Sequence, residues 1–242
     1  RLGAKVSVIE YGSVPIPGND KMVQKQLQKS LEEIGMEFIY NTAVKSAQVK
    51  GSSVELGASD KDGKDVKFSG DYCLVAIGRR PYTESLGLEN IGLELDSRGF
   101  VPVNEHLQTK QSNVYAIGDV IGGMMLAHKA EEEGICVAET IANGRGHVNY
   151  DAIPNVIYTF PEVATVGKTE EQLKQDGIPF KPGKFAMAAN GRAVAMGEGV
   201  GFIKVIAHKD TDRILGVHMI CPQASELIAE AGLAMEYYAS SE

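Results

Sequence analysis

A strand, a helix and a second strand follow one another in the first 40 residues, and this order limits how the chain can fold. The apolar run Val6–Ile9 is typical of a buried strand, and Met36–Tyr40 is typical of the next one. Between them we predict a helix over residues 20–35, because apolar residues recur at helical spacing after a capping Asn19 or Asp20. Parallel strands joined through a helix are the repeating unit of doubly wound α/β folds.

The next forty residues extend this α/β region. Three segments alternate between polar and apolar side chains, as in an antiparallel meander: residues 44–50, 53–58 and 65–68. Residues 72–77 form a continuous apolar run that ends at Gly78, and we expect a buried strand there. We therefore predict an incomplete Rossmann-like domain over residues 1–78, whose opening strand, glycine loop and helix would precede residue 1.

The remainder of the chain divides into two predicted regions. In the first region, residues 79–149, we predict mostly irregular structure over 79–115, a short buried strand at Val114–Ile117 and a helix over about residues 126–142. Residues 150–242 are predicted to form an α+β domain that ends in a helix over residues 224–238. Its expected strands are 156–160, 163–166, 184–188, 201–207 and 214–220, with a capped helix over Thr169–Asp176.

Charge and hydropathy exclude two classes of partner. The 242 residues include 24 basic and 32 acidic ones, for a net charge of −8. This acidic balance argues against nucleic acid, because phosphate binding needs a basic surface. No apolar run approaches the roughly 18 residues of a membrane helix, so we predict no membrane span. Neither end resembles a targeting segment, and we expect the chain to be an internal piece of a longer protein.

The cysteines and most histidines carry no recognisable chemistry. Cys73, Cys136 and Cys221 lie far apart without a C-x-x-C pair, so we predict neither a redox disulfide nor a metal site among them. All three lie in apolar runs and are interpreted as core residues, which favours a reducing compartment. Four histidines are interpreted as structural or surface residues: His106, His147, His208 and His218.

The run Thr109–Asp119 gives a sharper functional prediction. A threonine, a turn, four apolar residues and Gly118-Asp119 are typical of the second flavin fingerprint of proteins that bind two dinucleotides. Gly118 would let the backbone approach the cofactor, and Asp119 would bind a ribityl hydroxyl or lie near the pyrophosphate. The apolar run ending at Gly78 is its expected companion, about 40 residues upstream.

Glu10 follows the first predicted strand and suggests a second nucleotide. An acid at this tip accepts hydrogen bonds from adenosine ribose hydroxyls and repels a 2′-phosphate, which favours NAD over NADP. The matching glycine motif would lie before residue 1. An acid at a strand end is also commonly just a solvated side chain, and Glu10 alone leaves both interpretations open.

The helix that begins near Leu126 completes the pattern, because its N-terminal N–H groups can face an anionic isoalloxazine edge. At this point the sequence resembles the dihydrolipoamide dehydrogenase family of pyridine nucleotide–disulfide oxidoreductases. The resemblance covers essentially the whole chain. Its main segments are Ile77–Pro81, Tyr115–Asp119, Met124–Gly134, Val156–Ala164, Val166–Glu171 and Asp212–His218.

The resemblance implies specific cofactor contacts. The positions that match FAD contacts are Asp119, Met125, Leu126, Ala127 and His128. The positions that match NAD contacts are Glu10, Val44 and Gly78. The family's redox disulfide would lie before residue 1 and its His–Glu acid/base pair after Glu242, so we predict no catalytic residue within this chain.

The resemblance also implies a function for the whole protein. It would reoxidise dihydrolipoyl groups of 2-oxo acid dehydrogenase or glycine cleavage complexes, passing electrons through a disulfide and FAD to NAD. Expected partners are lipoyl domains and a second copy, which would bind through the interface domain at residues 150–242. The expected location is the mitochondrial matrix, or the cytoplasm of a bacterium. Two alternatives stay open: another flavin disulfide reductase, or an isolated non-catalytic fragment that acts as a folding or interaction module.

Overall fold

The chain divides into two compact units in a computed structural model that describes residues 2–242. One unit contains the residues up to Val75 together with Pro154–Glu242, and the other contains Ala76–Ile153. The first and third predicted regions therefore contribute to the same unit. The boundaries at residues 78 and 150 stay predictions, and Arg1 lies outside the described residues.

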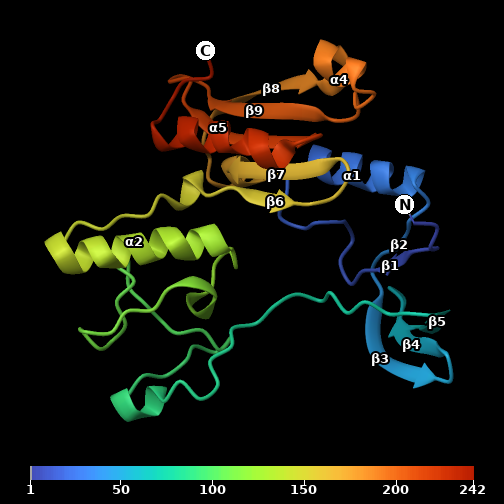
Figure 1. Cartoon of the computed structure of the whole chain (residues 1–242), viewed down its shortest axis with the longest axis horizontal. Coiled ribbons are helices and arrows are strands. Elements are labelled where there is room, and N and C mark those ends of the chain that lie inside the picture. The colour runs from blue at the N-terminus through green and yellow to red at the C-terminus, as the bar shows by residue number, and fades with distance from the viewer. Residues whose placement is uncertain (1) are drawn as a thin grey trace. The chain divides into compact units, whose positions relative to one another are not determined.

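The predicted strand–helix–strand order is confirmed in the first unit. Strand β1 (Ser7–Ile9) pairs in parallel with β2 (Glu37–Ile39), and α1 (Lys21–Glu33) connects them (Figure 1). The Asp20 carboxylate caps α1 by accepting a hydrogen bond of 2.9 Å from the backbone N–H of Met22. The prediction that the first strand is buried is wrong. Val8 and Ile9 are only half-buried, since β1 has β2 as its single strand neighbour.

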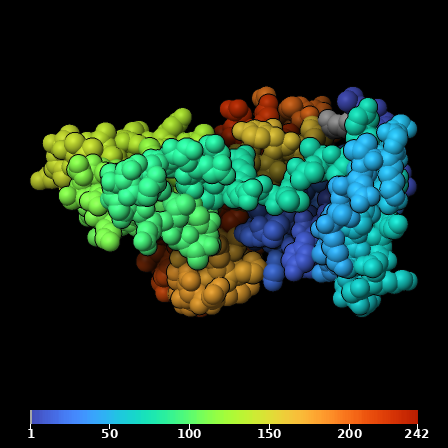
Figure 2. All heavy atoms as spheres, turned by 90° about the horizontal axis from the view of Figure 1, so that it is seen from below, coloured from blue at the N-terminus to red at the C-terminus, as the bar shows by residue number. Residues whose placement is uncertain are grey.

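The predicted meander is also confirmed. Strands β3 (Ala43–Lys50), β4 (Ser53–Ser59) and β5 (Asp65–Gly70) form an antiparallel sheet in the order β3-β4-β5. The register shifts between Val44 and Ser46, which is typical of a bulge in the first strand. This sheet is the light-blue to cyan part of the space-filling view (Figure 2).

The predicted buried strand at residues 72–77 is wrong. The segment has no strand structure, and Leu74 and Ile77 are 89% and 92% exposed. A strand is held by hydrogen bonds to a neighbouring strand, and none of the described strands pairs with this run. Cys73 is therefore exposed as well, which corrects its interpretation as a core residue.

A five-stranded antiparallel sheet forms the larger part of the first unit (Figure 1). Its order is β6-β7-β10-β9-β8, and helix α5 (Ala224–Glu236) packs on β7 and β10. The strands are β6 (Asn155–Ile157), β7 (Glu162–Gly167), β8 (Phe180–Ala186), β9 (Phe202–His208) and β10 (Ile214–Cys221). The predicted α+β arrangement of this region is confirmed, including the capping box of α3 (Glu170–Gln175). Helix α4 (Gly191–Ala195) follows β8.

Helix α1 packs against this sheet. Val23 and Leu27 from α1 share one hydrophobic cluster with Val163, Phe202 and Ile220 from the strands. Burying these apolar side chains together is the main force that holds the early part of the chain on the late part.

A buried ion cluster joins the same elements. The Lys204 ammonium on β9 lies 2.7 Å from the Asp20 carboxylate at the start of α1, and it also contacts Glu170 of α3. The side chains of Lys204 and Asp20 are 3% and 2% exposed. Nearby on β10, His218 is buried as well, with its Nε2 atom 3.0 Å from the carbonyl oxygen of Lys168.

The second unit is built around α2 (Ala127–Asn143) and is otherwise mostly irregular, as predicted (Figure 1). Short 3₁₀ turns lie at η1 (Leu88–Ile91), η2 (Gly118–Ile121) and η3 (Tyr150–Ala152). The predicted strand at Val114–Ile117 is wrong: only Tyr115 makes a bridge, to Gln108. A single bridge cannot extend into a strand without a longer partner. Across residues 2–242, the helices are too short or too polar to cross a membrane.

Candidate cofactor-binding site

Gly118 forms a tight, buried turn in front of α2. Its φ of +74° lies in the left-handed region that favours glycine. A Cβ at this position would come within 3.2 Å of the Ala130 Cβ, closer than most side-chain contacts allow. Both the backbone conformation and the lack of space therefore call for glycine here. The next residue, Asp119, is exposed on η2.

Two charged side chains of α2 form hydrogen bonds with the backbone of this turn. The Lys129 Nζ atom and the Glu133 Oε1 atom form an ion pair of 2.9 Å, and the two side chains are 3% and 0% exposed. Glu133 Oε2 accepts a 2.7 Å hydrogen bond from the Gly118 N–H. Lys129 donates to the carbonyl oxygens of Gly118, at 3.2 Å, and Gly122, at 3.0 Å.

Sequence reasoning missed this pair. The run His128–Gly134 contains one lysine and three consecutive glutamates, a charged composition that is typical of a solvated helix face. The spacing of four residues between Lys129 and Glu133 was the available signal, because such residues lie on one face of a helix.

The start of α2 offers backbone donors to a ligand. Its cap residue, Leu126, has an extended backbone, and no side chain caps the helix there. An uncapped N-terminus leaves backbone N–H groups and the positive end of the helix dipole available to an electron-rich group. Around this end, Met125, Leu126 and His128 are half-buried and Ala127 is exposed. Arg79 donates a long hydrogen bond of 3.4 Å to the Met125 carbonyl oxygen.

The predicted FAD residues thus all belong to one unit. Asp119 lies on η2, which contacts α2, and the other four residues form the start of α2 and the two positions before it. An exposed carboxylate at Asp119 can accept hydrogen bonds from hydroxyl groups. The uncapped start of α2 can donate to an anionic ring edge. The tight Gly118 turn packs against α2 and leaves Asp119 at the surface. This combination fits a flavin cofactor with its ribityl chain.

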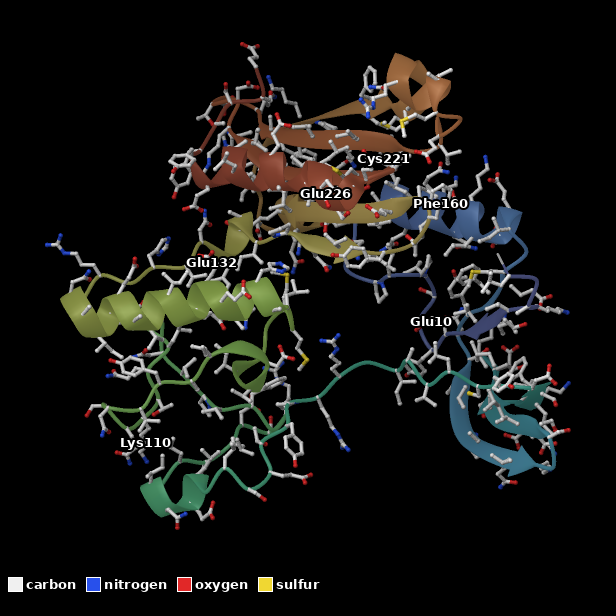
Figure 3. The ribbon with its side chains drawn as sticks, viewed as in Figure 1. Glu10, Lys110, Glu132, Phe160, Cys221 and Glu226 are labelled. Atoms are coloured by element: carbon white, nitrogen blue, oxygen red, sulfur yellow. The ribbon has the colours of Figure 1, made fainter. Side chains whose placement is uncertain are left out.

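The predicted NAD residues are less closely gathered. Glu10 lies at the end of β1 (Figure 3), half-buried, and its Oε1 atom accepts a 2.6 Å hydrogen bond from the Gly12 N–H. The Glu10 carbonyl oxygen accepts from Thr42, which brings β1 next to the start of β3. Val44 on β3 is 45% exposed. Gly78 belongs to the other unit, where it is exposed with a φ of +105°.

No catalytic or metal constellation is found among residues 2–242. All three cysteines are free, with Cys136 and Cys221 buried as predicted and Cys73 exposed. Burial, and then the nearby Glu162 carboxylate, raise the pKa of the Cys221 thiol to about 11, so it is not a ready thiolate. No group of three or more metal-binding side chains gathers within these residues.

Comparison with known families gives two matches along the chain. Residues 1–134 match a family described as pyridine nucleotide-disulphide oxidoreductase. Residues 153–242 match the dimerisation domain of pyridine nucleotide-disulphide oxidoreductases.

Curated relatives match over the whole chain. It is 54% identical to the mitochondrial dihydrolipoyl dehydrogenase of Caenorhabditis elegans over 244 residues, with 100% of this chain and 49% of the relative covered. It is 49% identical to the human mitochondrial protein of that name over 248 residues, which covers 100% of this chain and 48% of the relative. The chain spans about half the length of the curated relatives it matches.

Two solved structures share this fold. LpdA from Mycobacterium tuberculosis has a TM-score of 0.88 and 27% identity, with 99% of this chain and 51% of that one covered. The HOCl-induced flavoprotein disulfide reductase RclA from Escherichia coli has a TM-score of 0.85 and the same identity, covering 98% of this chain and 54% of that one.

Proposed function

Because this chain belongs to the pyridine nucleotide-disulphide oxidoreductase family, we propose that it is about half of a dihydrolipoyl dehydrogenase. Such an enzyme reoxidises dihydrolipoyl groups and reduces NAD, with a redox disulfide and FAD as electron carriers. Sequence identities of 54% and 49% to two dihydrolipoyl dehydrogenases, over the entire chain, support this proposal. The single observation that carries it is the locked Gly118–Asp119 turn beside the uncapped start of α2.

The FAD side of the proposal uses residues of the second unit. Asp119 would accept a hydrogen bond from a ribityl hydroxyl, and the backbone at Met125, Leu126, Ala127 and His128 would face the ring. FAD, when bound, supplies the hydride chemistry, and the protein orients it. These residues bind and orient, and the residues that form the redox disulfide and the acid/base pair would belong to the rest of the whole protein.

The NAD side of the proposal uses Glu10 and Val44, which both belong to the first unit. The Glu10 carboxylate keeps lone pairs beyond its bond to Gly12, and these would accept the adenosine ribose hydroxyls. Its negative charge would repel the extra phosphate of NADP. Val44, exposed on β3, would offer an apolar surface next to the adenosine. Gly78 lies in the other unit, and its contact with NAD stays a prediction from the resemblance.

The proposed partners follow from the same family. The match of residues 153–242 to a dimerisation domain supports a homodimer formed through the five-stranded sheet and its helices. Lipoyl domains of 2-oxo acid dehydrogenase complexes would present the dihydrolipoyl substrate. The relatives' names support a mitochondrial location, and the proposed compartment is the matrix.

Another flavin disulfide reductase is a weaker alternative. The two solved structures are 27% identical in sequence to this chain, against 49–54% for the dihydrolipoyl dehydrogenases of human and Caenorhabditis elegans. The other alternative is an isolated non-catalytic fragment that acts as a folding or interaction module.

The proposed flavin site at the Gly118–Asp119 turn is tested by replacing Asp119 in the full-length enzyme. We expect Asp119→Ala to lose most of its FAD on dialysis, because a charge-assisted hydrogen bond contributes roughly 1.5–3 kcal/mol. Glu132→Ala, an exposed change on α2, is the matched control and should keep its flavin. Full FAD occupancy in Asp119→Ala, measured by absorbance after dialysis, would show that this turn is not the flavin site.

A further inference from the structure

We propose that Lys129 and Glu133 are positioning residues for the flavin, which act by holding the Gly118–Asp119 turn in its binding shape. The inference rests on the proposed function, in which Asp119 contacts FAD. Neither residue was among the predicted cofactor contacts, and both are buried beneath the turn. They would touch the backbone and leave contact with the cofactor to Asp119.

The contacts fix both polar groups of Gly118. Its N–H donates to Glu133 Oε2 and its carbonyl oxygen accepts from Lys129 Nζ. The two side chains come from one turn of one helix, so the peptide groups on either side of Gly118 are tied to α2. The same helix begins at the proposed ring-binding end, so this pair sets the distance between the two parts of the site.

Gly118 needs such an external restraint. Glycine has no Cβ, so it adopts left-handed and right-handed conformations with similar ease and does not by itself select one of them. The bonds from Glu133 and Lys129 select the conformation with φ of +74°, which directs the chain into η2 and presents Asp119 at the surface.

Tyr150 completes the arrangement from η3. Its hydroxyl donates a 2.9 Å hydrogen bond to Glu133 Oε1, the same oxygen that faces Lys129. Oε2 is thereby directed toward Gly118. Burial, and then the hydrogen bond to Glu133 and its charge, raise the pKa of the Tyr150 hydroxyl, so it stays protonated as a donor.

The buried Lys129–Glu133 pair is better explained by the backbone conformation that it selects than by any stability that it adds. Removing two charges from water costs free energy, and an apolar pair of similar size often stabilises a protein as well or better. Here each charged group also satisfies backbone groups of the turn, which apolar side chains could not do.

The test compares Glu133→Gln with its exposed neighbour Glu132→Gln in the full-length enzyme (Figure 3 labels Glu132 on α2). A neutral amide cannot accept hydrogen bonds from Gly118, Lys129 and Tyr150 together, so at least one of the bonds that fix the turn is lost. We expect the FAD dissociation constant of the Glu133→Gln apoenzyme, from fluorescence titration, to rise roughly tenfold. The Glu132→Gln apoenzyme should bind FAD like the wild type.

A double-mutant cycle with Asp119→Ala separates positioning from general damage. If Glu133 acts through Asp119, adding Glu133→Gln to Asp119→Ala should change the FAD dissociation constant less than twofold. Additive losses in the double variant, or unchanged binding in Glu133→Gln alone, would overturn the inference. Undiminished binding in Asp119→Ala itself would instead remove the proposed flavin site.

Tyr150→Phe keeps the inference testable if Glu133→Gln does not fold. This variant removes one hydroxyl and keeps the ring. We expect a smaller rise in the FAD dissociation constant, about threefold, which disappears in the Asp119→Ala background. An effect of Tyr150→Phe that persists in that background would count against the inference.

Discussion

At the scale of single residues, the proposed cofactor contacts include two acidic side chains, Glu10 and Asp119. Glu10 directly follows β1 and is half-buried, and Asp119 directly follows Gly118 and is exposed. Both were predicted from local motifs, because a few neighbouring residues define each position. The Lys129–Glu133 pair was not predicted, because its importance comes from Gly118, whose backbone lies 11 and 15 positions away along the chain.

Glu10 should decide which nicotinamide cofactor the full-length enzyme uses. Glu10→Arg replaces a repelling charge by an attracting one, and we expect the ratio of NADP to NAD use to rise at least about tenfold, or about 1.4 kcal/mol. The measurement is kcat/KM for each nucleotide. Glu33→Arg, an exposed change on α1, controls for net charge. An unchanged preference in Glu10→Arg would contradict the proposed role.

At the scale of elements, the sequence predicted the helices and hairpins more accurately than the isolated strands. Helix α1 carries its own cap and the meander its own turns, so both were predicted close to their observed ends. The apolar run at residues 72–77 was predicted as a strand and is not one. A strand needs hydrogen bonds to another strand, which can lie far away in the sequence, and hydrophobicity alone does not supply them.

The capping box of α3 gives an element-scale prediction. The Thr169 hydroxyl accepts from the Gln172 N–H while the Gln172 side chain accepts from the Thr169 N–H. Thr169→Ala removes one of these bonds, and we expect about 1 kcal/mol of lost stability toward urea. Thr211→Ala, at an exposed position outside any helix, should leave the unfolding midpoint unchanged. Equal midpoints for Thr169→Ala and the wild type would show that the box contributes nothing.

At the scale of the whole molecule, the first unit is held together by contacts between its early and late segments. The Asp20–Lys204 ion pair spans 184 positions, and Val23 and Leu27 reach the sheet across a similar separation. Sequence patterns predicted the elements on both sides but not their packing, because no local signal links residues so far apart.

The buried Lys204 should stabilise this unit in a pH-dependent way. Burial acts to raise the pKa of Asp20, but the hydrogen bond and charge of Lys204 outweigh it, and the pKa lies below its usual value. Because the pKa of Asp20 is lower in the folded chain than in the unfolded chain, where it is about 4, the ionised side chain adds stability above about pH 4. That stability is lost as the pH falls further. Lys204→Met should therefore cost about 3–5 kcal/mol at neutral pH, and less near pH 3.

Urea unfolding at pH 7 and pH 3 measures this effect. Lys21→Met removes a lysine that is 75% exposed and serves as the control, with little expected change at either pH. A loss for Lys204→Met that is the same at both pH values would mean that the pairing with Asp20 does not contribute.

The central claim, that this chain is half of a dihydrolipoyl dehydrogenase, is tested most directly by turnover. We would mix the full-length protein with dihydrolipoamide and NAD and follow NADH absorbance, with residues 1–242 alone as the comparison. We predict rapid NADH formation by the full-length, flavin-containing protein, and none above the buffer blank by residues 1–242. A full-length protein that carries flavin but does not reduce NAD with dihydrolipoamide would contradict the account, as would turnover by residues 1–242 alone.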